Sequence, residues 1–195
     1  MDLPLVLAGL DQESWSQLHH AYGSAEDVPA LLRGLASLEE ETAEEAEQEL
    51  WSSIVHQGTV YTATAPTVPF LARLIAEGVR RNALVGMLGV IAASADEHDL
   101  PVPGAAREAV AAQLGLLLPL LADDDREVRR ITAWTVAQCR RAAGADARTA
   151  LRARRVPSGV GPVCRRQQRP GAVTGDGDGS AWVPRSRTRE SRAAV

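Results

Sequence analysis

The sequence predicts an all-α protein, an α-solenoid of about three helix pairs with a disordered C-terminal tail. The stretch Leu117–Cys139 reads LLPLLADDDREVRRITAWTVAQC, where an apolar helix end, a cluster of three Asp residues and a second helix follow one another. Shorter copies of its first half stand at Val28–Leu32 and Val68–Ala72. Beyond about residue 155 no helical or strand period persists, which favours disorder.

The three copies share a proline, at Pro29, Pro69 and Pro119, so the steps between them are 40 and 50 residues. Recurrence at about 40 residues is typical of helix-pair solenoids. The longer step contains Asp96–Gly104, a polar segment marked by Pro and Gly, which predicts a loop inserted at one edge of the stack.

Each copy is followed by a second helix. The segments Glu40–His56, Arg81–Ser94 and Asp125–Arg141 place apolar residues three and four positions apart, as amphipathic or buried helices do. One carboxylate of the Asp cluster at 123–125 is expected to cap the third of these helices, and Gly144 is expected to end it.

Two further segments precede or join the pairs. Asp11–His20 is expected to form a short helix with Trp15 and Leu18 facing inward. Between Gln57 and Pro66 the chain reads GTVYTATA, whose β-branched residues suggest a short strand. Because no partner strand is evident, we interpret this segment as a loop.

The charge of the chain is unevenly divided. All 21 basic residues are Arg, and the net charge is −4. Residues 1–150 hold 11 Arg against 22 acidic residues, whereas residues 151–195 hold 10 Arg against 3. An acidic body argues against nucleic-acid binding, which needs clustered basic residues to neutralise phosphates.

The boundary near residue 150 has two interpretations. Residues 1–150 form the helical domain, and residues 151–195 form either a natural disordered arm for an acidic partner or the product of a frameshift. GC-rich DNA read out of frame gives such an Arg/Gly/Pro mixture, and composition favours this second interpretation. Reading the other frames of the gene distinguishes the two.

No targeting or membrane segment is predicted. Met1–Leu10 is apolar, but Asp2 stands where a signal peptide carries positive charge, and the run is too short to span a bilayer. The expected location is the cytoplasm.

The pattern from Leu117 to Ala133 resembles a HEAT repeat. The segment Glu49–Leu71 resembles bacterial, mainly actinobacterial, HEAT-repeat proteins of unassigned function, and the resemblance covers roughly residues 10–145. In such repeats an Asp in the turn and an Arg in the second helix bond along the stack. The resemblance therefore implies a ladder formed by Asp123 or Asp125 with Arg129.

No catalytic, metal or cofactor residue is predicted. The histidines lie at positions 19, 20, 56 and 98 without the spacing of a metal site, and of the two cysteines Cys139 is expected in the core while Cys164 lies in the tail. Trp15, Trp51 and Trp134 fall on or beside apolar stripes, so core packing is expected for each.

The leading functional hypothesis is non-catalytic binding of a protein partner through the stacked surface. The best candidate for partner contact is the loop with His56, Gln57, Thr59 and Tyr61, although a purely structural connection explains it equally well. The acidic run Glu39–Glu49 could attract a basic partner, but a solvated helix face is the simpler interpretation. The alternatives are a HEAT-like lyase or hydroxylase and an immunity or regulatory partner of a toxin.

Overall fold

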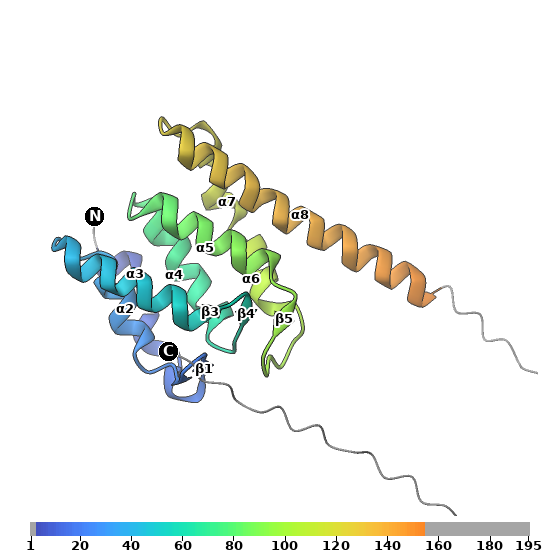
Figure 1. Cartoon of the computed structure of the whole chain (residues 1–195), viewed down its shortest axis with the longest axis horizontal. Helices are drawn as coiled ribbons and strands as arrows, with labels where there is room; N and C mark the ends of the chain where they lie inside the picture. The colour runs from blue at the N-terminus through green and yellow to red at the C-terminus, as the bar shows by residue number, and fades with distance from the viewer. Residues whose placement is uncertain (1–2, 155–195) are drawn as a thin grey trace, which may run out of the picture. The chain divides into compact units, whose positions relative to one another are not determined.

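The computed structural model describes residues 3–154, with side chains described for residues 3–140. This part is mostly helical, as expected (Figure 1). Its helices are α1 (Leu3–Val6), α2 (Val28–Gly34), α3 (Glu40–Ile54), α4 (Thr64–Ala76), α5 (Arg81–Ala93), α6 (Ala105–Ala112), α7 (Leu114–Leu117) and α8 (Arg126–Arg154), with 3-10 turns η1 (Leu10–Gln12), η2 (Trp15–Gln17) and η3 (Leu118–Ala122). Residues 155–195, most of the predicted tail, lie outside the described residues.

The helices form two rows. Helices α2, α4, α6 and α7 contact one another on one side, while α3, α5 and α8 run side by side in the same direction on the other (Figure 1). Consecutive members of the rows pack together, α2 on α3 and α4 on α5. Helix α5 lies between its neighbours, and its side chains from Leu84 to Leu88 are buried, which explains its nearly uniform apolar sequence.

The third pair departs from the first two. Its first half is divided into α6, α7 and η3, and Pro119 lies in the first turn of η3. Its second half, α8, runs on to Arg154, so the expectation that Gly144 ends this helix was wrong. A glycine ends a helix only when it takes a left-handed conformation, and here the backbone stays helical through it.

The segment Asp11–His20 does not form the expected helix. It contains two short 3-10 turns and then β1 (His19–His20), which pairs antiparallel with β2 (Gly23–Ser24). Trp15 is buried as expected, and its indole nitrogen donates to the carbonyl of Leu10 at 2.7 Å. Hydrogen bonds to distant residues replace the helical ones here. The amide of Ala63, for example, donates to the carbonyl of His19 at 3.0 Å.

The interpretation of the segment after Gln57 as a loop was also wrong. Strands β3 (Val55–His56) and β4 (Thr59–Val60) form an antiparallel hairpin, and β4 pairs in parallel with β5 (Asp96–Glu97). The partner strands therefore come from the last two residues of the segment Glu40–His56, predicted to be helical, and from the inserted segment predicted to be a loop. Gln57 and Gly58 both have positive φ, as the tightest hairpin turns require.

The core is aliphatic, as the composition indicates. Its fully buried large side chains are Leu10, Leu32, Leu35, Leu50, Ile54, Leu71, Leu74, Ile75, Leu84, Met87, Leu88 and Ile91. They come from both rows of helices and from the N-terminal turns, and with smaller buried side chains they form one cluster that extends from Val6 to Cys139 on α8.

Two glycines on α5 have different surroundings. A Cβ atom at Gly89 would lie 2.1 Å from Cζ3 of Trp134 and 2.5 Å from Oγ1 of Thr135 on α8. A Cβ atom at Gly86, one turn earlier, would meet Ile131 at 3.5 Å, which is ordinary van der Waals contact. Gly89 therefore permits the close approach of α8, whereas Gly86 leaves room beside it.

We predict opposite effects for the two Gly→Ala substitutions. Gly89→Ala should lower the free energy of unfolding by about 1–3 kcal/mol, because Trp134 and Thr135 must move. Gly86→Ala should raise it by roughly 0.5–1 kcal/mol, because Ala favours the helix and fits the space. Urea unfolding followed by circular dichroism measures both; equal effects would show that α8 does not pack on α5 in this way.

Candidate functional site

A groove crosses the row formed by α3, α5 and α8. Its polar end is a hollow of about 720 Å³ whose walls include Glu47 of α3, Arg80 and Arg81 at the start of α5, and Asp123 before α8. The residues come from three helices that are distant in the sequence, so the groove exists only because these helices lie side by side.

Two adjacent arginines hold the polar end together by reaching in opposite directions. Arg80 donates to the carboxylate of Glu47 and, at 2.9 Å, to that of Glu40, both on α3. The hydrogen bond to Glu47 has the largest effect and that to Glu40 the next; together they raise the pKa of the Arg80 guanidinium above its ordinary value. Arg81 donates to Asp123 at 3.0 Å and so ties α5 to the turn before α8.

Arg80 also adopts a left-handed conformation, with φ of 40°. A side chain in this region costs free energy unless its surroundings hold it there. The two carboxylates of α3 supply that restraint, and Gly78 in the same turn also has positive φ. The turn before α5 is therefore shaped to aim Arg80 at α3 and Arg81 at α8.

The other end of the groove is apolar. A hollow of about 350 Å³ lies over Gly86 on α5, between Trp51 on α3 and Trp134 on α8. Trp51 is 36% exposed and Trp134 is 40% exposed, so the expectation of core packing was wrong for both, although it holds for Trp15. Each of the two indoles covers part of α5 and leaves the rest of its surface to solvent.

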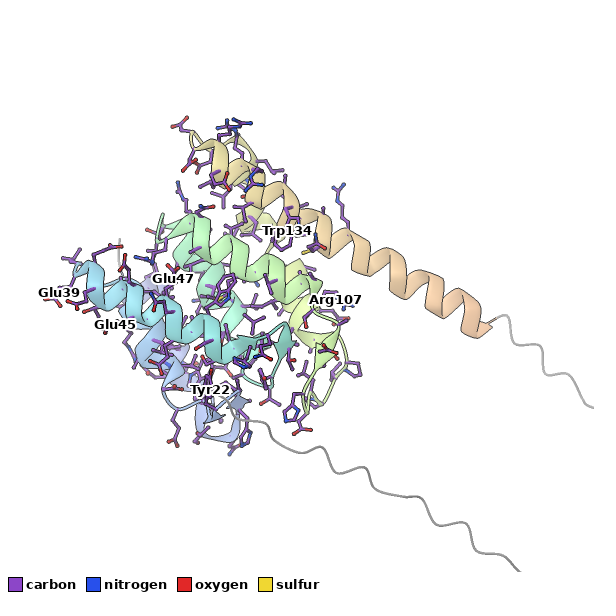
Figure 2. All side chains as sticks on the ribbon, viewed as in Figure 1. Tyr22, Glu39, Glu45, Glu47, Arg107 and Trp134 are labelled. Atoms are coloured by element: carbon purple, nitrogen blue, oxygen red, sulfur yellow. The ribbon has the colours of Figure 1, made fainter. Side chains whose placement is uncertain are left out.

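The outer side of α3 is strongly acidic. We use the term acidic ridge for the exposed side chains Glu41, Glu44 and Glu45 of this helix. Figure 2 shows Glu39 and Glu45 projecting away from α5, whereas Glu47 lies on the α5 side. No ion pair joins the ridge to another residue that the structure describes, in contrast to Glu40 and Glu47.

The residues suggested for partner contact lie together at a different edge. His56 and Thr59 face each other across the hairpin of β3 and β4, Gln57 is exposed at its turn, and Tyr61 follows β4 half-buried. The hydroxyl of Tyr22 lies 3.3 Å from Nδ1 of His56. The small strands thus place His56 and Tyr61 beside the β1–β2 hairpin, which the sequence did not indicate.

All four histidines of the chain gather at this edge. His19, His20 and His98 line a hollow of about 320 Å³, and the ring of His98 lies 5.7 Å from that of Tyr61. His20 is buried and its Nε2 lies 3.0 Å from a carboxylate oxygen of Asp27. Nevertheless, the described residues contain no group of three or more His, Cys, Asp or Glu side chains able to hold a metal ion.

Hydrogen bonds at this edge have a structural role. The buried hydroxyl of Thr64 donates to the carbonyl of Ile54 at 2.6 Å and accepts from the amide of Tyr61 at 2.9 Å. The amide of His19 donates to Thr62 at 2.7 Å. These bonds tie the end of α3, the hairpins and the start of α4 together, so the edge acts at least as a connection between helix pairs.

The residues expected to form a ladder lie at the start of α8. Asp125 accepts a hydrogen bond from the amide of Glu127 at 2.7 Å and so caps the helix. Arg129 donates to the carbonyls of Asp123 and Asp124 at 2.7 and 2.9 Å, within its own turn. The contact to the preceding pair is made instead by the carboxylate of Asp123, which accepts from Arg81.

Cys139 is buried on α8, as expected for a core residue. Burial raises the pKa of its thiol, which keeps the sulfur protonated and unreactive. Cys164 lies outside the described residues. The cysteine whose surroundings are known is therefore placed for packing and not for nucleophilic chemistry.

Comparisons of the chain with protein-family models, curated proteins and solved structures gave no match. Within residues 3–154, no single helix is both long and apolar enough to cross a bilayer. Taken together, the bent pair Ala105–Ala112 and Leu114–Ala122 has the length and composition to do so.

Two buried threonines should respond oppositely to replacement by valine. Thr64→Val removes one donor and one acceptor at the loop edge and should lower the free energy of unfolding by about 2 kcal/mol. Thr132 is the matched control, because its buried hydroxyl has no hydrogen-bond partner among the described residues. Thr132→Val should change stability little or raise it by up to about 1 kcal/mol. Thermal unfolding of both variants checks this; equal losses would contradict the hydrogen bonds assigned to Thr64.

Proposed function

We propose that this chain is a non-catalytic protein-binding scaffold of HEAT-repeat type, and that its partner binds in the groove across α3, α5 and α8. The observation that carries the proposal is the pair of partly exposed indoles, Trp51 and Trp134, on either side of the hollow over Gly86. Tryptophan is among the residues that most often dominate the energy of protein interfaces.

The arrangement of the helices supports a repeat stack. The pairs α2 with α3, α4 with α5, and α6–α7 with α8 follow the order of the three sequence copies, and their second helices lie in one row (Figure 1). Stacked pairs present a continuous face built from many repeats, which suits a polypeptide partner better than a small molecule. We therefore assign the three pairs to three HEAT-like units.

The chemistry of the groove supports binding in preference to catalysis. Its charged side chains are engaged with one another, Arg80 with Glu47, Arg81 with Asp123, and Arg130 with Glu127. Hydrogen bonding to Arg130 lowers the pKa of the Glu127 carboxyl, which keeps it ionised and unsuited to act as a proton donor near neutral pH. The acidic ridge also opposes nucleic acid and anionic membranes.

Site-specific cross-linking tests the proposal. A photo-reactive amino acid at Arg130, an exposed position at the apolar end of the groove, should cross-link a defined protein in an extract of the native host. The same group at Glu108, exposed on α6, is the matched control and should not give this product.

The proposed binding through the groove fails under either of two outcomes. One is an identical set of products from Arg130 and Glu108, which would indicate contact without a preferred surface. The other is the absence of any product from Arg130 while the protein remains folded by circular dichroism.

A further inference from the structure

Helix α3 carries both one wall of the groove and the acidic ridge. In α3, Glu44, Gln48 and Trp51 are separated by four and three residues, so they follow one line along the helix surface toward the apolar hollow. Glu41 and Glu45 flank this line on the side away from α5. A molecule that is seated in the hollow and extends across the outer side of α3 therefore meets these exposed carboxylates.

The opposite wall is different. On α8, Glu127, Arg130 and Trp134 are separated by three and four residues; Glu127 lines the polar end of the groove, and Arg130 and Trp134 line the hollow. Because Arg130 is bound to Glu127, this wall contributes little net charge. The groove thus has an apolar floor and paired charges on its α8 side, and the exposed carboxylates of the acidic ridge lie beyond its α3 side.

We propose that the occupant of the groove is a cationic amphipathic segment of a partner protein. Its apolar face would place one large side chain in the hollow between Trp51 and Trp134, and its Lys or Arg side chains would meet the acidic ridge. This identification of the partner's chemistry rests on the binding function proposed above.

Three physical arguments support a cationic occupant. Glu41, Glu44 and Glu45 have no cation among the described residues, so opposite charge from a partner lowers their mutual repulsion. An Arg or Lys side chain that reaches past the ridge also gains from contact with an indole face, of which Trp51 and Trp134 offer two. An amphipathic helix that lays its apolar face in a groove is a recurring mode of peptide recognition.

Fluorescence anisotropy with the full chain and labelled peptides tests this inference. The probe is a basic amphipathic helix of about 18 residues, with Leu and Phe on one face and Arg and Lys on the other. Two control peptides keep the length. One carries Glu in place of Arg and Lys, and the other keeps the basic composition in an order that breaks the apolar face. The probe should bind about tenfold more tightly than either control, and its affinity should fall as salt rises.

Matched variants distinguish the effect of the acidic ridge on probe binding from the effect of net charge. Replacing Glu41, Glu44 and Glu45 by Gln should weaken probe binding about 5- to 10-fold. The control variant Glu13→Gln/Glu26→Gln/Glu108→Gln removes the same charge from exposed positions elsewhere and should weaken it less than about twofold, since screened distant charges matter little. Equal losses in the two triple variants would overturn the inference, because binding would then follow net charge alone.

Substitutions that fill the hollow test whether the apolar face of the peptide binds there. Gly86→Leu should abolish the preference for the amphipathic peptide over its scrambled form. Gly86→Ala, whose Cβ fits beside Ile131, should reduce that preference in a protein that stays folded, so the test does not depend on the larger side chain. Unchanged preference in both variants would place the apolar face of the peptide elsewhere.

Other occupants give distinct results. Tighter binding of the acidic peptide, or self-association by sedimentation that Gly86→Leu removes, would overturn the cationic assignment. A groove-specific cross-linked partner that lacks a basic amphipathic segment would also overturn it, yet would leave the proposed binding function standing. Failure of the Arg130 cross-linking experiment with the peptide preferences intact would count instead against a native partner at this surface.

Discussion

Helix α8 lies so close to α5 that the indole of Trp134 occupies the space that a Cβ atom would need at Gly89. The same contact contains a buried hydrogen bond, in which the hydroxyl of Thr135 donates to the carbonyl of Val85 at 2.9 Å. The position of α8 sets the width of the groove, the placement of Trp134 and the reach from Arg81 to Asp123. A small residue at one position of α5 therefore controls features on three helices.

The two ends of the groove follow from the turn before α5 and from the floor at Gly86. Arg80 and Arg81 diverge from that turn to α3 and to Asp123, so electrostatic contacts align the starts of the second helices. Because Gly86 on α5 has no side chain, the space between Trp51 and Trp134 stays open. The same helix thus supplies a polar end held by ion pairs and an open apolar end.

The loop edge combines a local strand pattern with residues from elsewhere in the chain. The β-branched residues Thr59 and Val60 favour a strand, which pairs with β3 across the hairpin and with Asp96 and Glu97 from the segment inserted before α6. The amide of His98 completes the connection by donating to the carbonyl of Val60 at 2.9 Å. The insertion is therefore part of the structure at this edge, where it also places His98 beside the hollow that His19 and His20 line.

The sequence by itself determined the second helix of each pair, because apolar residues three and four positions apart specify helical faces wherever the neighbouring helix lies. It placed α3, α5 and the start of α8, the aliphatic core and the buried Cys139. Only the tertiary structure decided the exposure of Trp51 and Trp134, since an apolar side chain at the border of a stripe is buried or open according to what packs beside it. The tertiary structure also decided the strands and the groove, because both are formed by residues that lie far apart in the sequence.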